Sequence, residues 1–128
     1  MIVLALIALI IVPIGAFVWA KRQRPQSVWA VTGASFGLVV APVSLGLYAT
    51  YFLGPLGIVT GMPGLLSALF HGAPGYYICT FVGIVPERTV VEGVGNFYVE
   101  ASSGVFWALI YGALGWFVDY ARRRKVAL

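Results

Sequence analysis

The stretch Lys21-Arg22-Gln23-Arg24-Pro25-Gln26-Ser27 separates two long apolar runs near the start of the chain. A second basic cluster follows the last apolar run, close to the end of the chain. Together the clusters hold seven of the eight basic residues: Lys21, Arg22, Arg24, Arg122, Arg123, Arg124 and Lys125. Because basic residues of membrane proteins concentrate on the cytoplasmic side, this pattern predicts a polytopic membrane protein with both clusters in the cytoplasm.

The composition agrees with a membrane protein. Of the 128 residues, 61% are hydrophobic and only 9% are charged, whereas a soluble domain has about a quarter charged residues. The net charge of +4 does not indicate nucleic-acid binding, because that function needs basic residues spread over an exposed face. We expect one membrane domain comprising residues 1–128.

Three apolar runs are predicted to be transmembrane helices: residues 1–20, 28–53 and 102–118. The first would be about 30 Å long as a helix, which matches the hydrocarbon thickness of a bilayer. It has no basic residues before it, so we interpret it as a retained anchor, not a cleaved signal. This places the N-terminus outside and the C-terminus in the cytoplasm.

Residues 62–85 are apolar but interrupted by glycine and proline, and Gly72-Ala73-Pro74-Gly75 has the composition of a turn. The two arms around it would each be about 15 Å long, which is too short to cross a bilayer. A single additional crossing would also place the C-terminal cluster on the wrong side. We therefore predict an all-α integral membrane protein with three spans and a re-entrant or interfacial helical hairpin; the alternative is four transmembrane helices, with residues 64–85 crossing.

Residues 87–100 are predicted to form an outer loop. They contain three acidic residues and one basic residue, a balance opposite to that of the cytoplasmic clusters. Gly93, Gly95 and Asn96 favour a turn, with short strands at residues 89–91 and 97–99.

Small residues recur at four-residue spacing in the second and third spans: Gly33, Gly37 and Ala41, then Gly104, Ala108 and Gly112. Such faces allow close approach of helices in lipid. We expect the two faces to pack against each other within the chain. The alternative is an interface with a second copy or another protein.

The candidate polar or pathway residues are His71, Glu87, Arg88, Glu92 and Glu100. A membrane histidine near a carboxylate could carry protons, and paired carboxylates could act as acid and base. The sequence favours structural roles instead, with His71 at a helix end and the carboxylates as solvated loop charges. Asp119 lies at the spacing at which it would meet Arg122 and Arg123 on a helix.

No motif for catalysis, metal binding or a cofactor is present. One cysteine, Cys79, and one histidine are too few for the four ligands of a structural zinc site. Cys79 lies in an apolar segment and is expected to be an inert, packed thiol. We therefore expect no enzyme activity and no cofactor.

The leading functional hypothesis is an accessory or scaffold subunit of the bacterial inner membrane that binds a membrane-protein partner. The basic clusters would also attract anionic lipid at the cytoplasmic face. One alternative is an oligomeric channel or carrier that uses residues 62–85 and His71, with a homo-oligomer as its working form. Another is an enzyme acting on lipid at the interface.

Overall fold

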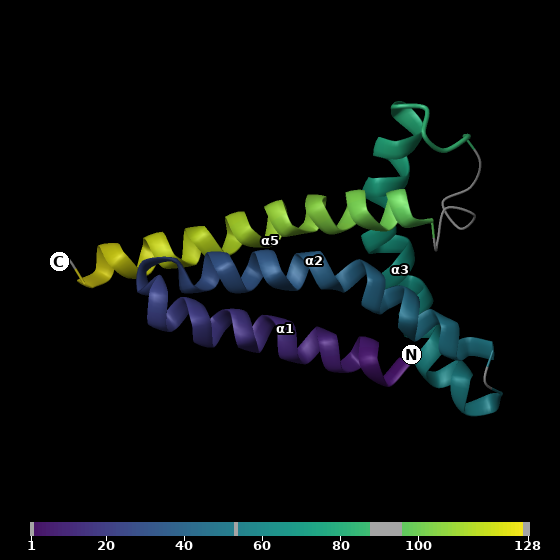
Figure 1. The fold of residues 1–128 in the computed structure, drawn as a ribbon, viewed down its shortest axis with the longest axis horizontal. Coiled ribbons are helices and arrows are strands. Elements are labelled where there is room, and N and C mark those ends of the chain that lie inside the picture. The colour runs from purple at the N-terminus through teal and green to yellow at the C-terminus, as the bar shows by residue number, and fades with distance from the viewer. Residues whose placement is uncertain (1, 53, 88–95, 127–128) are drawn as a thin grey trace.

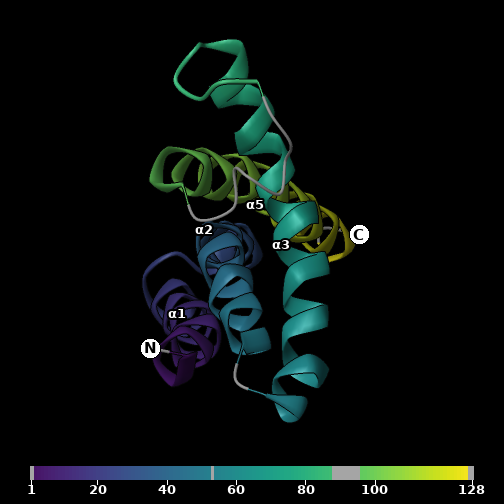
Figure 2. The same ribbon diagram turned by 90° about the vertical axis from the view of Figure 1, so that its right-hand side faces the viewer.

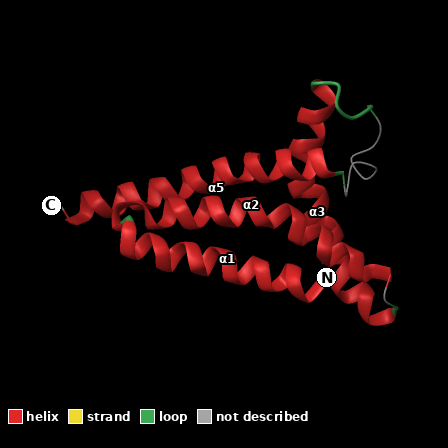
Figure 3. Ribbon diagram, viewed as in Figure 1, coloured by secondary structure: helices red, strands yellow, loops and turns green. Residues whose placement is uncertain are grey.

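The computed structural model describes residues 2–52, 54–87 and 96–126, and within these ranges it contains helices and no strand (Figure 3). The long helices are α1 (Ile2–Gln23), α2 (Val28–Tyr48), α3 (Pro55–Phe81) and α5 (Phe97–Val126). Two short 3₁₀ turns, η1 (Pro25–Ser27) and η2 (Ala49–Phe52), follow α1 and α2. The segments Pro25–Phe52, Pro55–Phe81 and Phe97–Lys125 are long and apolar enough to span a membrane. The all-α membrane class is thus confirmed.

Helices α1, α2 and α5 lie side by side, and α3 crosses α2 and α5 (Figure 1). The view turned by 90° shows α3 beside α2 and α5 and still transverse to them (Figure 2). The turn between α1 and α2 lies next to the end of α5, so the two basic clusters are at the same end of the molecule. At this end α5 contacts the start of α2, since the Arg122 guanidinium lies 5.1 Å from the ring centre of Trp29.

Small residues form the contact between α2 and α5. A Cβ atom built on Gly33 would overlap the backbone of Tyr111, and one on Gly37 would overlap Trp107 and Ala108. On α5, a Cβ atom at Gly112 would lie 3.3 Å from the Ala34 Cβ. The two predicted small-residue faces therefore lie against each other within one chain.

The predicted hairpin at residues 62–85 is wrong, because α3 is one continuous helix through Gly72-Ala73-Pro74-Gly75. Its small residues recur every three or four positions and lie on one side of the helix. Cβ atoms built on four of them would overlap neighbouring chain: Gly57 and Gly61 against η2, Gly64 against the end of α2, and Gly75 against α5. The glycines are contact positions for neighbouring helices, and membrane helices tolerate glycine and proline for this reason.

Helix α3 ends at Phe81, and Gly83, two residues further on, has a left-handed φ of 74°. The Ile84 N–H donates to the Cys79 carbonyl at 2.9 Å, and the Gly83 N–H donates to the Thr80 carbonyl at 3.0 Å. These two bonds form a Schellman motif, the usual glycine-dependent helix end. The helix therefore continues for six residues beyond Gly75, the last residue of the predicted turn, and ends at Phe81.

Helix α5 is longer than the predicted span of 102–118 at both ends. Asn96 caps its first turn, where the Tyr98 N–H donates to the Asn96 Oδ1 at 3.0 Å. The strand predicted at residues 97–99 is therefore wrong, since these residues are helical. The strand predicted at residues 89–91, and most of the loop, lie outside the described residues.

Candidate functional site

His71 lies in the middle of α3, where this helix crosses α5, and not at the end of a helix. Its Nδ1 is 2.9 Å from the Ser67 carbonyl oxygen, and its Nε2 is 3.1 Å from the Tyr111 hydroxyl. A carbonyl oxygen can only accept, so Nδ1 must donate the proton in that bond. In a neutral imidazole Nε2 is then the acceptor, and the Tyr111 hydroxyl donates to it.

The hydrogen bonds continue from α3 to α2, with the α3 side chain again as the donor. The Ser44 hydroxyl donates to the Val40 carbonyl at 2.6 Å, so its oxygen accepts the bond of 2.7 Å that it shares with the Ser67 hydroxyl. The chain therefore runs from Tyr111 through His71 and Ser67 to Ser44, and we call these four residues the His71 network. It connects three helices, and each donor in it has an acceptor.

Side chains of α5 also bond backbone groups of α3 near Pro74. The Trp107 Nε1–H donates to the His71 carbonyl at 2.9 Å. The Ser103 hydroxyl donates to the Gly72 carbonyl and accepts from the Gly75 N–H, both at 3.0 Å. A proline inside a helix disturbs the local backbone bonding, and neighbouring membrane helices can restore it. This arrangement explains how α3 continues through Pro74.

Neither Glu87 nor Glu100, the two predicted carboxylates among the described residues, is a hydrogen-bond partner of His71. Glu87 is exposed beyond the end of α3, and Glu100 lies in the first turn of α5. Arg88 and Glu92 are outside the described residues. Within the described ranges, no group of three or more His, Cys, Asp or Glu side chains could hold a metal ion.

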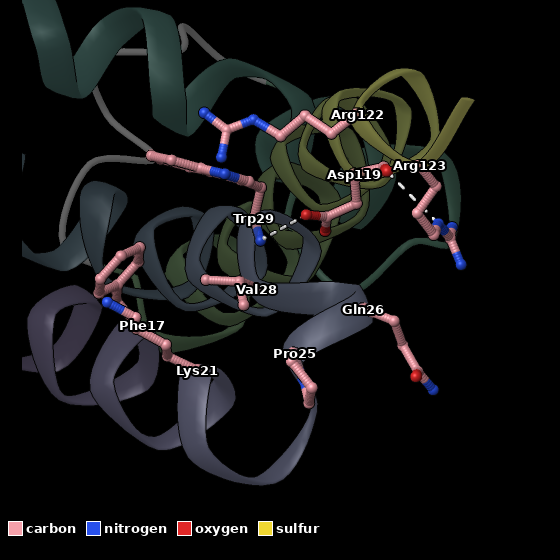
Figure 4. Close-up of a pocket in the computed structure, with 9 residues that line it drawn as sticks. All are labelled: Phe17, Lys21, Pro25, Gln26, Val28, Trp29, Asp119, Arg122 and Arg123. Carbon is pink, nitrogen blue, oxygen red and sulfur yellow. Dashed lines mark hydrogen bonds between the residues drawn. The ribbon is translucent and has the colours of Figure 1, made fainter. Parts of the chain in front are cut away.

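The opposite end of the molecule contains a pocket of about 580 Å³, shown in Figure 4. It lies between the end of α1, η1, the start of α2 and the end of α5. We call it the basic pocket, and its lining residues are Phe17, Lys21, Pro25, Gln26, Val28, Trp29, Asp119, Arg122 and Arg123.

Asp119 lines this pocket and caps α2. Its Oδ2 accepts a bond of 2.9 Å from the Ala30 N–H, and its Oδ1 accepts one of 3.3 Å from the Trp29 N–H (Figure 4). The predicted pairing of its carboxylate with Arg122 or Arg123 is not seen. Arg123 instead donates to the main-chain oxygen of Asp119 at 3.3 Å. The first turn of α2 thus takes the place of the arginines as the partner of the carboxylate.

This cap could not be predicted from local sequence, because the two donors, Trp29 and Ala30, lie 90 and 89 residues from Asp119. Serine is a common cap residue, but Ser27, at the cap position of α2, forms no side-chain cap bond. A helix start without a local cap needs a partner from elsewhere, since its first N–H groups have no acceptor within the helix.

Comparison with protein-family models, curated proteins and solved structures finds no match. The His71 network uses its donors and acceptors within the fold, whereas the basic pocket is open.

Proposed function

We propose that this chain is a non-catalytic accessory or scaffold subunit of a bacterial inner membrane, which binds a larger membrane protein through the outer face of α3. The observation that carries the proposal is the two-sided character of α3. Its small residues face α2, η2 and α5, while large apolar side chains point away from the molecule. We define the outer face by its exposed members, Leu56, Val59, Leu66, Phe70, Tyr77 and Phe81.

These side chains are mostly uncovered by the rest of the chain. Leu56 is 84% exposed and Phe81 is 94% exposed. The spacing of three, four or seven residues along α3 places them in one ridge. Lipid or another membrane protein must cover this ridge in the membrane.

The transverse direction of α3 favours a protein partner. Its 27 residues extend over about 40 Å. Because α3 runs transverse to α1, α2 and α5 (Figures 1 and 2), it does not stand along the bilayer normal when these three helices do. With these three across the membrane and the basic end in the cytoplasm, α3 would lie along the outer part of the bilayer. There its ridge extends beyond the other helices, as an interaction surface for a neighbouring protein would.

The polar groups support a structural role. The His71 network and the bonds of Ser103 and Trp107 hold the crossing of α3 and α5 in one geometry. A rigid crossing presents the outer face in a fixed direction, which suits a scaffold.

The test is purification of the full-length chain from its native membrane in a mild detergent. We expect a membrane protein to co-purify in a fixed ratio, and the triple substitution Leu56→Ala, Leu66→Ala and Phe81→Ala to abolish its recovery. The matched control changes exposed apolar residues of α5 and should leave recovery unchanged: Leu109→Ala, Leu114→Ala and Phe117→Ala.

Equal loss of the partner with both triple variants would contradict the role of α3. Recovery of the chain only with copies of itself would overturn the accessory-subunit proposal and favour the oligomeric alternative.

A further inference from the structure

We propose that the basic pocket binds a phosphate group with net negative charge, supplied by an anionic phospholipid headgroup or by a soluble phosphate compound. This inference depends on the membrane fold and not on the proposed partner of α3.

The pocket collects positive charge from separate parts of the chain. Lys21 comes from the end of α1, while Arg122 and Arg123 come from the end of α5. The one acidic residue in the lining, Asp119, is 5% exposed and directs both carboxylate oxygens at the first turn of α2. The lining is therefore net positive, with its single negative group already bonded.

Arg122 is held in a geometry suited to phosphate. Its guanidinium lies over the ring of Trp29, with the carbon 5.1 Å from the ring centre (Figure 4). The planar fork of N–H groups on a guanidinium matches two oxygens of a phosphate, and the contact with Trp29 holds this group at the pocket. Among the described residues, neither Lys21 nor Arg122 forms an ion pair.

The remaining walls match the headgroup region of a bilayer. Phe17 and Trp29 meet edge to face, with ring centres 5.7 Å apart, and tryptophan is enriched at the membrane interface. A cavity of about 580 Å³ is within the usual range of about 300–1,000 Å³ for small-molecule sites. An apolar wall next to cations at the end of apolar helices is what an anionic lipid would contact.

The chain provides a matched control for the key residue. Arg124 also lies over an aromatic ring, that of Tyr120, at 5.0 Å, but it does not line the basic pocket. Replacing Arg122 or Arg124 with glutamine removes the same charge from the same segment. A specific pocket distinguishes the two variants, whereas general attraction by a basic tail does not.

The experiment titrates the purified full-length protein in detergent with short-chain phosphatidylglycerol or phosphatidylcholine of equal chain length, and measures binding by native mass spectrometry. We expect phosphatidylglycerol to bind about tenfold more tightly than phosphatidylcholine. Arg122→Gln should weaken the binding of phosphatidylglycerol by about tenfold, which corresponds to the loss of one hydrogen bond to a charged group. Lys21→Gln should also weaken binding. Arg124→Gln and Lys125→Gln should change it by less than about twofold, as exposed charges outside a site do.

A second arm distinguishes the source of the phosphate. If millimolar inorganic phosphate displaces phosphatidylglycerol from the parent protein, the ligand is a soluble phosphate compound; if it does not, the ligand is the lipid headgroup. The proposal is overturned if the two lipids bind equally, or if the pocket and control variants weaken binding to the same extent. Failure of the α3 variants to lose a partner would leave this result unaffected.

Discussion

Asp119 near the end of α5 accepts a hydrogen bond of 2.9 Å from the N–H of Ala30 in the first turn of α2, across 89 residues of sequence. The bond joins the start of α2 to the end of α5 at the basic end of the molecule. A carboxylate at a helix start also interacts favourably with the helix dipole. The contact therefore both completes α2 and holds α5 beside the turn that carries Lys21, Arg22 and Arg24.

Replacing Asp119 with alanine should destabilise the protein. Two N–H groups would lose their acceptor at a site where Asp119 is only 5% exposed, which costs about 1–3 kcal/mol. Unfolding in mixed micelles with increasing SDS should show the loss. Val118→Ala, at an exposed neighbouring position, should change stability by much less, and equal effects of the two variants would show that the cap contributes nothing.

Gly37→Ala should separate α2 from α5. Its Cβ atom would overlap the backbone of Trp107 and Ala108, and the backbone can relieve the overlap only by moving, at a cost of about 1–3 kcal/mol. Gly15→Ala is the control, because a Cβ atom there meets nothing within 4 Å. The same SDS titration should place Gly15→Ala within about 1 kcal/mol of the parent; a similar loss in both variants would contradict the close contact.

The sequence predicted the helical class and the positions of three helices, because long apolar runs and flanking charges are strong signals in a membrane protein. It failed at α3, where glycine and proline were interpreted as breaks. In water that interpretation has a sound basis, but within a membrane the decisive feature is spacing. Gly57, Gly61, Gly64, Ala68 and Gly75 follow the period of a helix face, and this pattern was present in the sequence.

Two glycines of α3 test whether the helix is continuous through the predicted turn. A Cβ atom on Gly75 would overlap the Val99 carbonyl and the Ser103 hydroxyl, whereas one on Gly72 meets nothing within 4 Å. We expect Gly75→Ala to lower stability by about 1–3 kcal/mol and Gly72→Ala to be neutral or stabilising. Helix content measured by circular dichroism should stay unchanged in Gly72→Ala; a loss there would indicate that a flexible turn is required.

The site was less predictable than the fold. The two basic clusters, one near each end of the chain, could be read from the sequence, and the structure places Lys21 and Arg122 in one pocket. Ser67 is one helical turn from His71 and is a local partner. Tyr111 could not be predicted as the second partner, because it is 40 residues away in the sequence. Their meeting depends on the angle at which α3 crosses α5, which no local sequence pattern specifies.

The His71 network predicts a specific tautomer. Because Nδ1 donates to the Ser67 carbonyl, a neutral His71 should carry its proton on Nδ1. His71 is the only histidine, so ¹⁵N NMR of histidine-labelled protein reports this site without ambiguity. Tyr111→Phe should remove the partner of Nε2 and cost about 1 kcal/mol, whereas Tyr98→Phe at an exposed position should be neutral. A proton on Nε2 in the parent protein would contradict the direction of the network.

Cysteine labelling tests the sidedness on which the membrane orientation depends. Gln26→Cys and Arg124→Cys, both at exposed positions at the basic end, should react with an impermeant thiol reagent from the same face of sealed vesicles. Glu87→Cys, exposed beyond the end of α3, should react from the opposite face, because acidic residues are on the outer side in the proposed orientation. The native Cys79 is 0% exposed, so the parent protein should give no background until it is unfolded. Labelling of Gln26→Cys and Arg124→Cys from different faces would contradict the bond between Asp119 and Ala30 as well as the orientation, because that bond requires the two ends to share one side.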